Sequence, residues 1–90
     1  MKLVVKLFGL GVSRAERSRL EGEFRDAVLN WQPSVELLLK CKNKRNRDYF
    51  TMLSIGTVAV QNLLGKERTK YMKIDVSIIG KPNSISPRIK

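Results

Sequence analysis

The chain has 90 residues and a formal net charge of +10, because eighteen lysines and arginines face eight acidic residues. This length has room for one domain with one core. Hydrophobic residues make up 42% of the chain and charged residues 29%, which excludes a disordered composition. Like charges at this density repel one another and cost stability, so a polyanion that offsets them, nucleic acid first of all, is the expected partner.

Residue types that are missing exclude several kinds of chemistry. The chain has no histidine and one cysteine, Cys41, so it cannot form an intrachain disulfide or a cysteine-based zinc site. The most common general base and metal ligand is also absent. No glycine-rich nucleotide-binding motif or P-loop is present. We therefore expect a non-enzymatic protein without metal or cofactor, in which Cys41 is a buried, unreactive thiol.

The N-terminal residues are where a targeting signal or membrane segment would lie. The apolar stretch from Leu3 to Val12 is interrupted by Lys6 and lacks a small-residue cleavage site, so we expect no secretory signal and no membrane span. Residues 2–19 resemble an organelle transit peptide in composition, but residues 3–8 have the pattern of a strand. The sequence favours a soluble, cytoplasmic protein that does not bind membranes.

The first half of the chain predicts a strand, a helix and a second strand. Alternation of apolar residues predicts a strand over residues 2–8, and two glycines then allow a turn. Ser13 and Glu16 form a capping box, and a helix is expected from there to about Trp31, before Pro33. Its inward stripe is Leu20, Phe24, Ala27, Val28 and Trp31. Residues 34–42 alternate again and predict a strand, followed by a polar loop over 42–48.

The second half is less clear. Residues 49–64 are compatible with a strand at 49–55 plus a short helix at 57–64, with one helix, or with a hairpin. Residues 71–79 alternate and predict the last strand. The proline- and serine-rich residues 81–90 predict a flexible tail behind a single basic domain at 1–80.

These elements predict an α+β fold. A long and a short helix on one face of a small antiparallel sheet bury both amphipathic surfaces, and the ferredoxin-like, split βαβ order is the simplest arrangement. This arrangement leaves the second sheet face and the 42–48 loop exposed to a partner.

Two groups of cations are the candidate binding residues. Lys42, Lys44, Arg45 and Arg47 lie together at the expected tip of a hairpin, and Tyr49 follows with a ring that could stack on a base. Lys66, Arg68 and Lys70, with Lys73 behind them, form the second group. In the expected helix, arginines pair with acids three or four residues away, although Arg17 projects near the inward stripe.

The sequence thus favours a nucleic-acid-binding protein, with RNA slightly preferred over DNA. The alternative is a small protein-binding adaptor or inhibitor, encoded for example by a phage or mobile element, that uses its basic face or a sheet edge. A homodimer is compatible with both hypotheses. Gathering of the cations on one surface would favour the first hypothesis, and scattering would favour the second.

Overall fold

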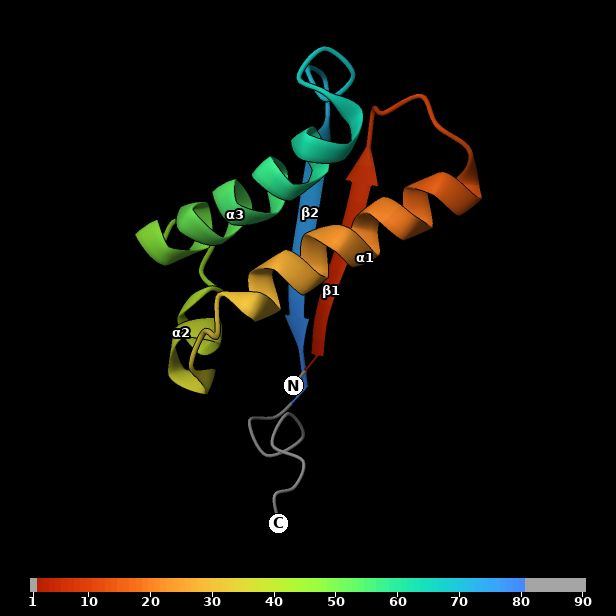
Figure 1. The fold of residues 1–90 in the computed structure, drawn as a ribbon. Helices are drawn as coiled ribbons and strands as arrows, with labels where there is room; N and C mark the ends of the chain where they lie inside the picture. Colours follow the sequence, from red (N-terminus) through yellow and green to blue (C-terminus); the bar gives the residue numbers. More distant parts are fainter. Residues whose placement is uncertain (1, 81–90) are drawn as a thin grey trace.

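A computed structural model describes residues 2–80 and shows two strands and three helices (Figure 1). In chain order the elements are β1 (Lys2–Phe8), α1 (Arg14–Asn30), α2 (Val35–Lys40), α3 (Arg47–Leu64) and β2 (Lys73–Ile79). The predicted tail at 81–90 lies outside the described residues. In the part of the chain that is described, no helix has the length and apolar character that a membrane crossing requires.

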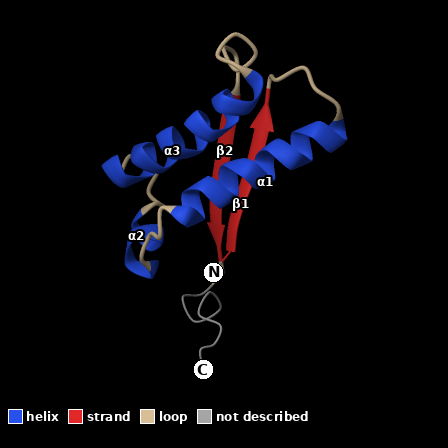
Figure 2. Cartoon of the chain, viewed as in Figure 1, coloured by secondary structure: helices blue, strands red, loops and turns tan. Residues whose placement is uncertain are grey.

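The two strands come from opposite ends of the described chain and pair antiparallel along their full length, from Lys2 opposite Ile79 to Phe8 opposite Lys73. Helices α1 and α3 lie together on one face of this sheet, and α2 lies beside them (Figure 2). The α+β class is confirmed. The ferredoxin-like order is not, because that order needs four strands and residues 2–80 contain two.

Helix α1 forms where its sequence signals place it. The Ser13 hydroxyl accepts a hydrogen bond from the Glu16 N–H at 3.2 Å, which satisfies one free donor of the first turn. The helix ends at Asn30, with Trp31 as its C-cap and Pro33 soon after. Leu20, Phe24 and Val28 are fully buried, as the helical spacing predicted.

Residues 34–42, which we predicted as a strand, contain the short helix α2 (Val35–Lys40) instead. The Ser34 hydroxyl caps this helix by accepting the Leu37 N–H at 3.1 Å, and Glu36 lies in the first turn. Leu38 and Cys41, three positions apart, are the buried residues. The apolar pattern of this segment fits the two-residue period of a strand and the 3.6-residue period of a helix, since apolar residues lie at 35, 37, 38, 39 and 41. The capping hydroxyl of Ser34 favours the helix.

Residues 47–64 form one continuous helix, α3, which was one of the three arrangements left open for 49–64. Its cap is Asn46, whose side-chain oxygen accepts the Asp48 N–H at 2.7 Å. From Tyr49 to Leu64 it carries no charged residue. Gly56 faces the ring of Phe24, and a Cβ at this position would overlap that ring. The glycine therefore allows α1 and α3 to approach closely.

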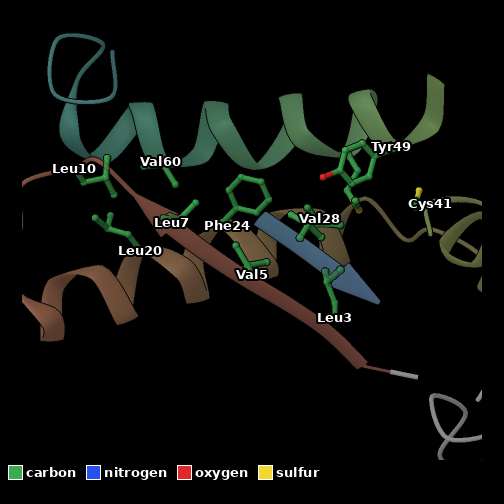
Figure 3. Packing of buried hydrophobic residues seen from close by; sticks show 12 residues of the cluster. Leu3, Val5, Leu7, Leu10, Leu20, Phe24, Val28, Cys41, Tyr49 and Val60 are labelled. Carbon is green, nitrogen blue, oxygen red and sulfur yellow. The ribbon is translucent and has the colours of Figure 1, made fainter. Parts of the chain in front are cut away.

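The core fills the space between the two helices and the inner face of the sheet (Figure 3). Leu3, Val5 and Leu7 of β1 and Val76 of β2 are buried against the helices, as strand alternation requires. Phe24 lies at the centre of this cluster. Each strand therefore has an inner face that is buried and an outer face that no described element covers.

Candidate nucleic-acid interface

The first group of predicted binding residues lies on the loop between α2 and α3 and on the first residue of α3. It is not a hairpin tip, as we had predicted. Asn43 and Asn46 hold this connection in place, because their side-chain oxygens accept the backbone N–H groups of Arg45 and Asp48 at 3.0 and 2.7 Å. We call this group the α2–α3 loop cluster; it consists of Lys42, Lys44, Arg45 and Arg47, all of them exposed.

The position of this cluster at the start of α3 is unfavourable for the helix itself. The N-terminal end of a helix carries a partial positive charge, so a cation there costs about 0.3–1 kcal/mol. Arg47 is the first residue of α3, and Asp48 is the one acid in that turn. Arg47 therefore does not stabilise the helix that it begins, and its exposed side chain is available to a partner.

Tyr49 cannot stack on a base as we predicted, because it belongs to the core. Its exposed fraction is 6%, and it packs inward from the first turn of α3 (Figure 3). The next residue, Phe50, is 56% exposed, and its ring meets that of Tyr49 edge to face at 5.8 Å. A helix turns successive residues by about 100°, so only one of these two neighbouring aromatics can face the core.

The second group lies on the loop between α3 and β2, and Thr69 anchors it. Thr69 is 6% exposed, and its hydroxyl contacts the carbonyl oxygens of Gly65 and Lys66 at 3.2 and 3.1 Å. The Met72 N–H donates to the Thr69 carbonyl at 3.1 Å and closes the turn. We call this group the α3–β2 loop cluster; it consists of Lys66, Arg68 and Lys70, all exposed.

The two clusters lie at opposite ends of α3 and do not form one patch by themselves. The helix has 18 residues, so its ends are about 27 Å apart. The structure thus brings together the members of each cluster but not the two clusters. By the criterion stated from the sequence, the separation of the two clusters by itself favours the second hypothesis, a protein-binding adaptor. A continuous cationic surface would need further cations between them.

The outer face of the sheet provides such cations. Lys44 reaches it from the α2–α3 loop and pairs with Asp75 at 3.2 Å, and Asp75 lies opposite Lys6 in the sheet. Further along, Lys73 lies opposite Phe8, close to the α3–β2 loop. We call this surface the outer sheet face; it consists of Lys2, Val4, Lys6, Phe8, Lys73, Asp75, Ser77 and Ile79.

From the sequence we expected an open second sheet face, and of its residues only Lys73 was grouped with the predicted cationic clusters. Lys2, Lys6 and Lys73 are exposed there, and Phe8 is 44% exposed. Tyr71, two residues before Lys73, is 74% exposed. The strict alternation of β1 could have identified Lys2, Lys6 and Phe8. The alternation predicted for residues 71–79 also puts Tyr71 on the side of Lys73 and Asp75, although Tyr71 lies before β2 begins.

Few cations of these surfaces are neutralised. Within residues 2–80, ion pairs join Lys44 to Asp75, Arg17 to Glu21 at 3.8 Å, and Arg19 to Glu16 at 2.8 Å. The Arg19 guanidinium holds the pKa of Glu16 below its usual value, and Arg68 lowers that pKa further. The α3–β2 loop and the loop between β1 and α1 lie at the same end of the sheet (Figure 1).

The free edge of β1 carries an unusual contact. The backbone N–H of Leu7 donates to the Glu21 carboxylate of α1 at 2.9 Å. Neighbouring residues of a strand point their N–H groups to opposite edges, so those of Leu3 and Val5 face the same free edge as Leu7. Glu21 thus blocks one end of an edge that could otherwise pair with another strand.

Cys41, the one cysteine of the chain, is a buried free thiol. Burial raises the pKa of the Cys41 thiol and Asp48 adds to that rise, so the thiolate is disfavoured. Residues 2–80 contain no cluster of three potential metal ligands. A groove of about 280 Å³ lies between the α2–α3 loop and the edge of β2, lined by Cys41, Lys42, Lys44, Val76, Ser77 and Ile78. Its charged lining residues are cations.

Comparison with protein-family models, curated proteins and solved structures gives no match to this chain. Its function therefore has to be inferred from the surfaces described above.

Proposed function

We propose that this protein binds nucleic acid through the outer sheet face and the two loop clusters beside it. The observation that carries the proposal is the uncovered outer sheet face. It presents Lys2, Lys6 and Lys73 with a single acid, Asp75, which Lys44 already neutralises. A surface of this kind attracts phosphates through their charge and releases the counterions that surround them.

The route along this surface has a length that suits a polynucleotide. It begins at the α2–α3 loop cluster, crosses the sheet and ends at the α3–β2 loop cluster, about 27 Å away along α3. A small anionic ligand would not need cations over such a distance. Phosphates that repeat along a strand can contact all of them in turn.

Salt dependence tests the proposal. Fluorescence anisotropy would follow binding of labelled RNA and DNA, single-stranded and duplex, from about 50 to 200 mM salt. We expect the logarithm of affinity to fall steeply with the logarithm of salt concentration. The double variant Lys6→Gln/Lys73→Gln should reduce the slope by about 1.4 for single strands and about 1.8 for duplex DNA.

The matched control removes two cations from elsewhere. Arg25→Gln/Lys40→Gln has the same change of net charge, but these exposed residues lie on α1 and α2, not on the sheet. This variant should keep the salt slope of the wild type. Absence of binding to all four nucleic acids at low salt, or an equal loss of slope in both double variants, would overturn the proposal.

A second candidate function, a protein-binding adaptor, is favoured by the outer side of α3. Residues 49–64 carry no charge, and Phe50 and Val58 on this side are 56% and 53% exposed. Exposed apolar side chains that gather on one element are typical of protein interfaces. On a chain of net charge +10, this is also a surface where a second copy could approach with little charge repulsion.

A comparison of variants tests this second candidate. The full chain and its Phe50→Ser/Val58→Ser variant would be used as baits in a nuclease-treated lysate, and the mass of each free protein would be measured by light scattering. A partner or dimer that depends on the two apolar side chains supports the adaptor. The adaptor is contradicted if both baits capture the same proteins and both free proteins have the mass of a monomer.

A further inference from the structure

Two exposed aromatic residues lie at the same end of the sheet. Phe8 is the last residue of β1, and its cross-strand partner Lys73 is the first of β2; Tyr71 precedes Lys73 by two positions. Phe8 is 44% exposed and Tyr71 74%. Removing these rings from water would be favourable, yet no described part of the chain covers them.

The backbone holds these two segments against each other. Gly9 follows Phe8 with a φ of 80°, and a Cβ on it would lie 2.5 Å from the Tyr71 carbonyl oxygen. The turn before Tyr71 is fixed by the buried Thr69, whose hydroxyl contacts the carbonyls of Gly65 and Lys66. The two rings are thus presented from positions that the fold determines, which reduces the ordering cost of binding.

A cation accompanies each ring. The Arg17 guanidinium carbon lies 6.0 Å from the centroid of the Phe8 ring, and the Lys70 ammonium lies 5.8 Å from that of Tyr71. Lys73 lies opposite Phe8 in the ladder and two residues after Tyr71. A nucleotide has a flat base and an anionic phosphate within a few ångströms, and this pairing of ring and cation complements both parts.

We propose that Phe8 and Tyr71 stack on unpaired bases, so that the ligand of this surface is single-stranded nucleic acid. Arg17, Lys70 and Lys73 would contact the phosphates next to the stacked bases. This inference rests on the proposed function and adds the strandedness of the ligand. A duplex hides the faces of its bases between neighbouring pairs, so it can use the cations of the surface but not the rings.

Affinity measurements with matched ligands test the inference. Anisotropy would compare a uridine oligonucleotide, a thymidine oligonucleotide of the same length, and RNA and DNA duplexes with the same number of phosphates. We expect tighter binding of a single strand than of the corresponding duplex. Tyr71→Leu and Phe8→Leu should each weaken single-strand binding about 5- to 100-fold, with little effect on duplexes and an unchanged salt slope.

Phe50→Leu is the control, because it removes an aromatic ring that is 56% exposed on α3 and belongs to neither loop cluster nor sheet. It should leave binding unchanged. Circular dichroism would establish that Tyr71→Leu, a change at a largely exposed position, keeps the fold. Tighter binding of the uridine oligonucleotide would identify RNA as the ligand, and tighter binding of the thymidine oligonucleotide would identify DNA. Equal affinity would show that stacking alone is recognised.

The outcomes that overturn this inference differ from those that overturn the proposed function. Equal affinity for single strands and duplexes, with no effect of Tyr71→Leu, would refute stacking but leave nucleic-acid binding intact. No binding to any of the four ligands would refute both. A dimer that Tyr71→Leu dissociates, and that nucleic acid does not compete with, would show that a second copy covers the rings instead.

Discussion

The two faces of the sheet are built from the same fourteen residues of β1 and β2 and differ in almost every property. On the inner face, Leu3, Val5 and Leu7 are at most 6% exposed and pack under α1 and α3. On the outer face, Lys2, Lys6 and Phe8 alternate with them and are exposed. One set of side chains holds the fold together and the other is available to a partner, so substitutions on the two faces should separate stability from binding.

The largest expected effect is that of Leu7→Ala on the inner face. Leu7 is fully buried, and removal of its side-chain carbons leaves a cavity, so the free energy of unfolding should fall by about 2–5 kcal/mol. Lys6→Gln, one residue away on the outer face, should change it by less than about 0.5 kcal/mol. Urea denaturation would measure both. Similar losses in the two variants would show that the faces are not independent.

A smaller effect is expected at the contact between the helices that cover the inner face. Gly56→Ala places a methyl group against the buried Phe24 ring, so the free energy of unfolding should fall by about 1–3 kcal/mol. Gly22→Ala is the matched control. Its Cβ would meet only the Arg25 side chain at 3.7 Å, so the better helix propensity of alanine should stabilise by up to about 1 kcal/mol. Thermal unfolding of both variants would measure these changes. A more stable Gly56→Ala variant would mean that the helices do not pack as closely as described.

The smallest expected effect concerns the edge that joins the two faces. Glu21→Leu removes the acceptor of the Leu7 N–H, and the free energy of unfolding should fall by about 1 kcal/mol. Glu21→Gln keeps an acceptor oxygen and should recover most of this loss. Hydrogen exchange of the Leu7 amide would give a direct measure, with faster exchange in Glu21→Leu. Equal exchange in the wild type and both variants would contradict the assigned contact.

Elements with one consistent signal were predictable from the sequence. β1 matches its predicted range, because alternation from Lys2 to Phe8 has no competing period. α1 has a capping serine, a stripe at helical spacing and a proline behind it, and all three agree. β2 begins at Lys73 rather than at residue 71, which is a difference at the boundary only.

The remaining elements could not be predicted because they contain so many apolar residues that the helical and the strand period cannot be told apart. Five of the seven residues from Val35 to Cys41 are apolar, so the strand pattern that we recognised there coexisted with a helical one. The same density left residues 49–64 open. Capping residues carried the missing information: Ser34 and Asn46 each begin a helix, and the prediction used neither of them.

The errors in the predicted binding site came from the errors in the predicted fold. The cationic clusters could be recognised from charge alone, whereas the hairpin tip and the exposed Tyr49 depended on strands that are helices. The two tyrosines differ in the same way. Tyr49 was misplaced because α3 was not recognised, whereas the alternation predicted for residues 71–79 puts Tyr71 on the same side as Lys73 and Asp75.

The pairing of β1 with β2 also has a consequence for how the chain folds. Partners such as Lys2 and Ile79 are separated by almost the whole described sequence, so the sheet closes a very long loop. Contacts of this kind slow folding, and the ribosome releases β1 long before β2 is synthesised. Until then the apolar side of β1 has only the helices to pack against, and the edge of β1 that later pairs with β2 has no partner strand.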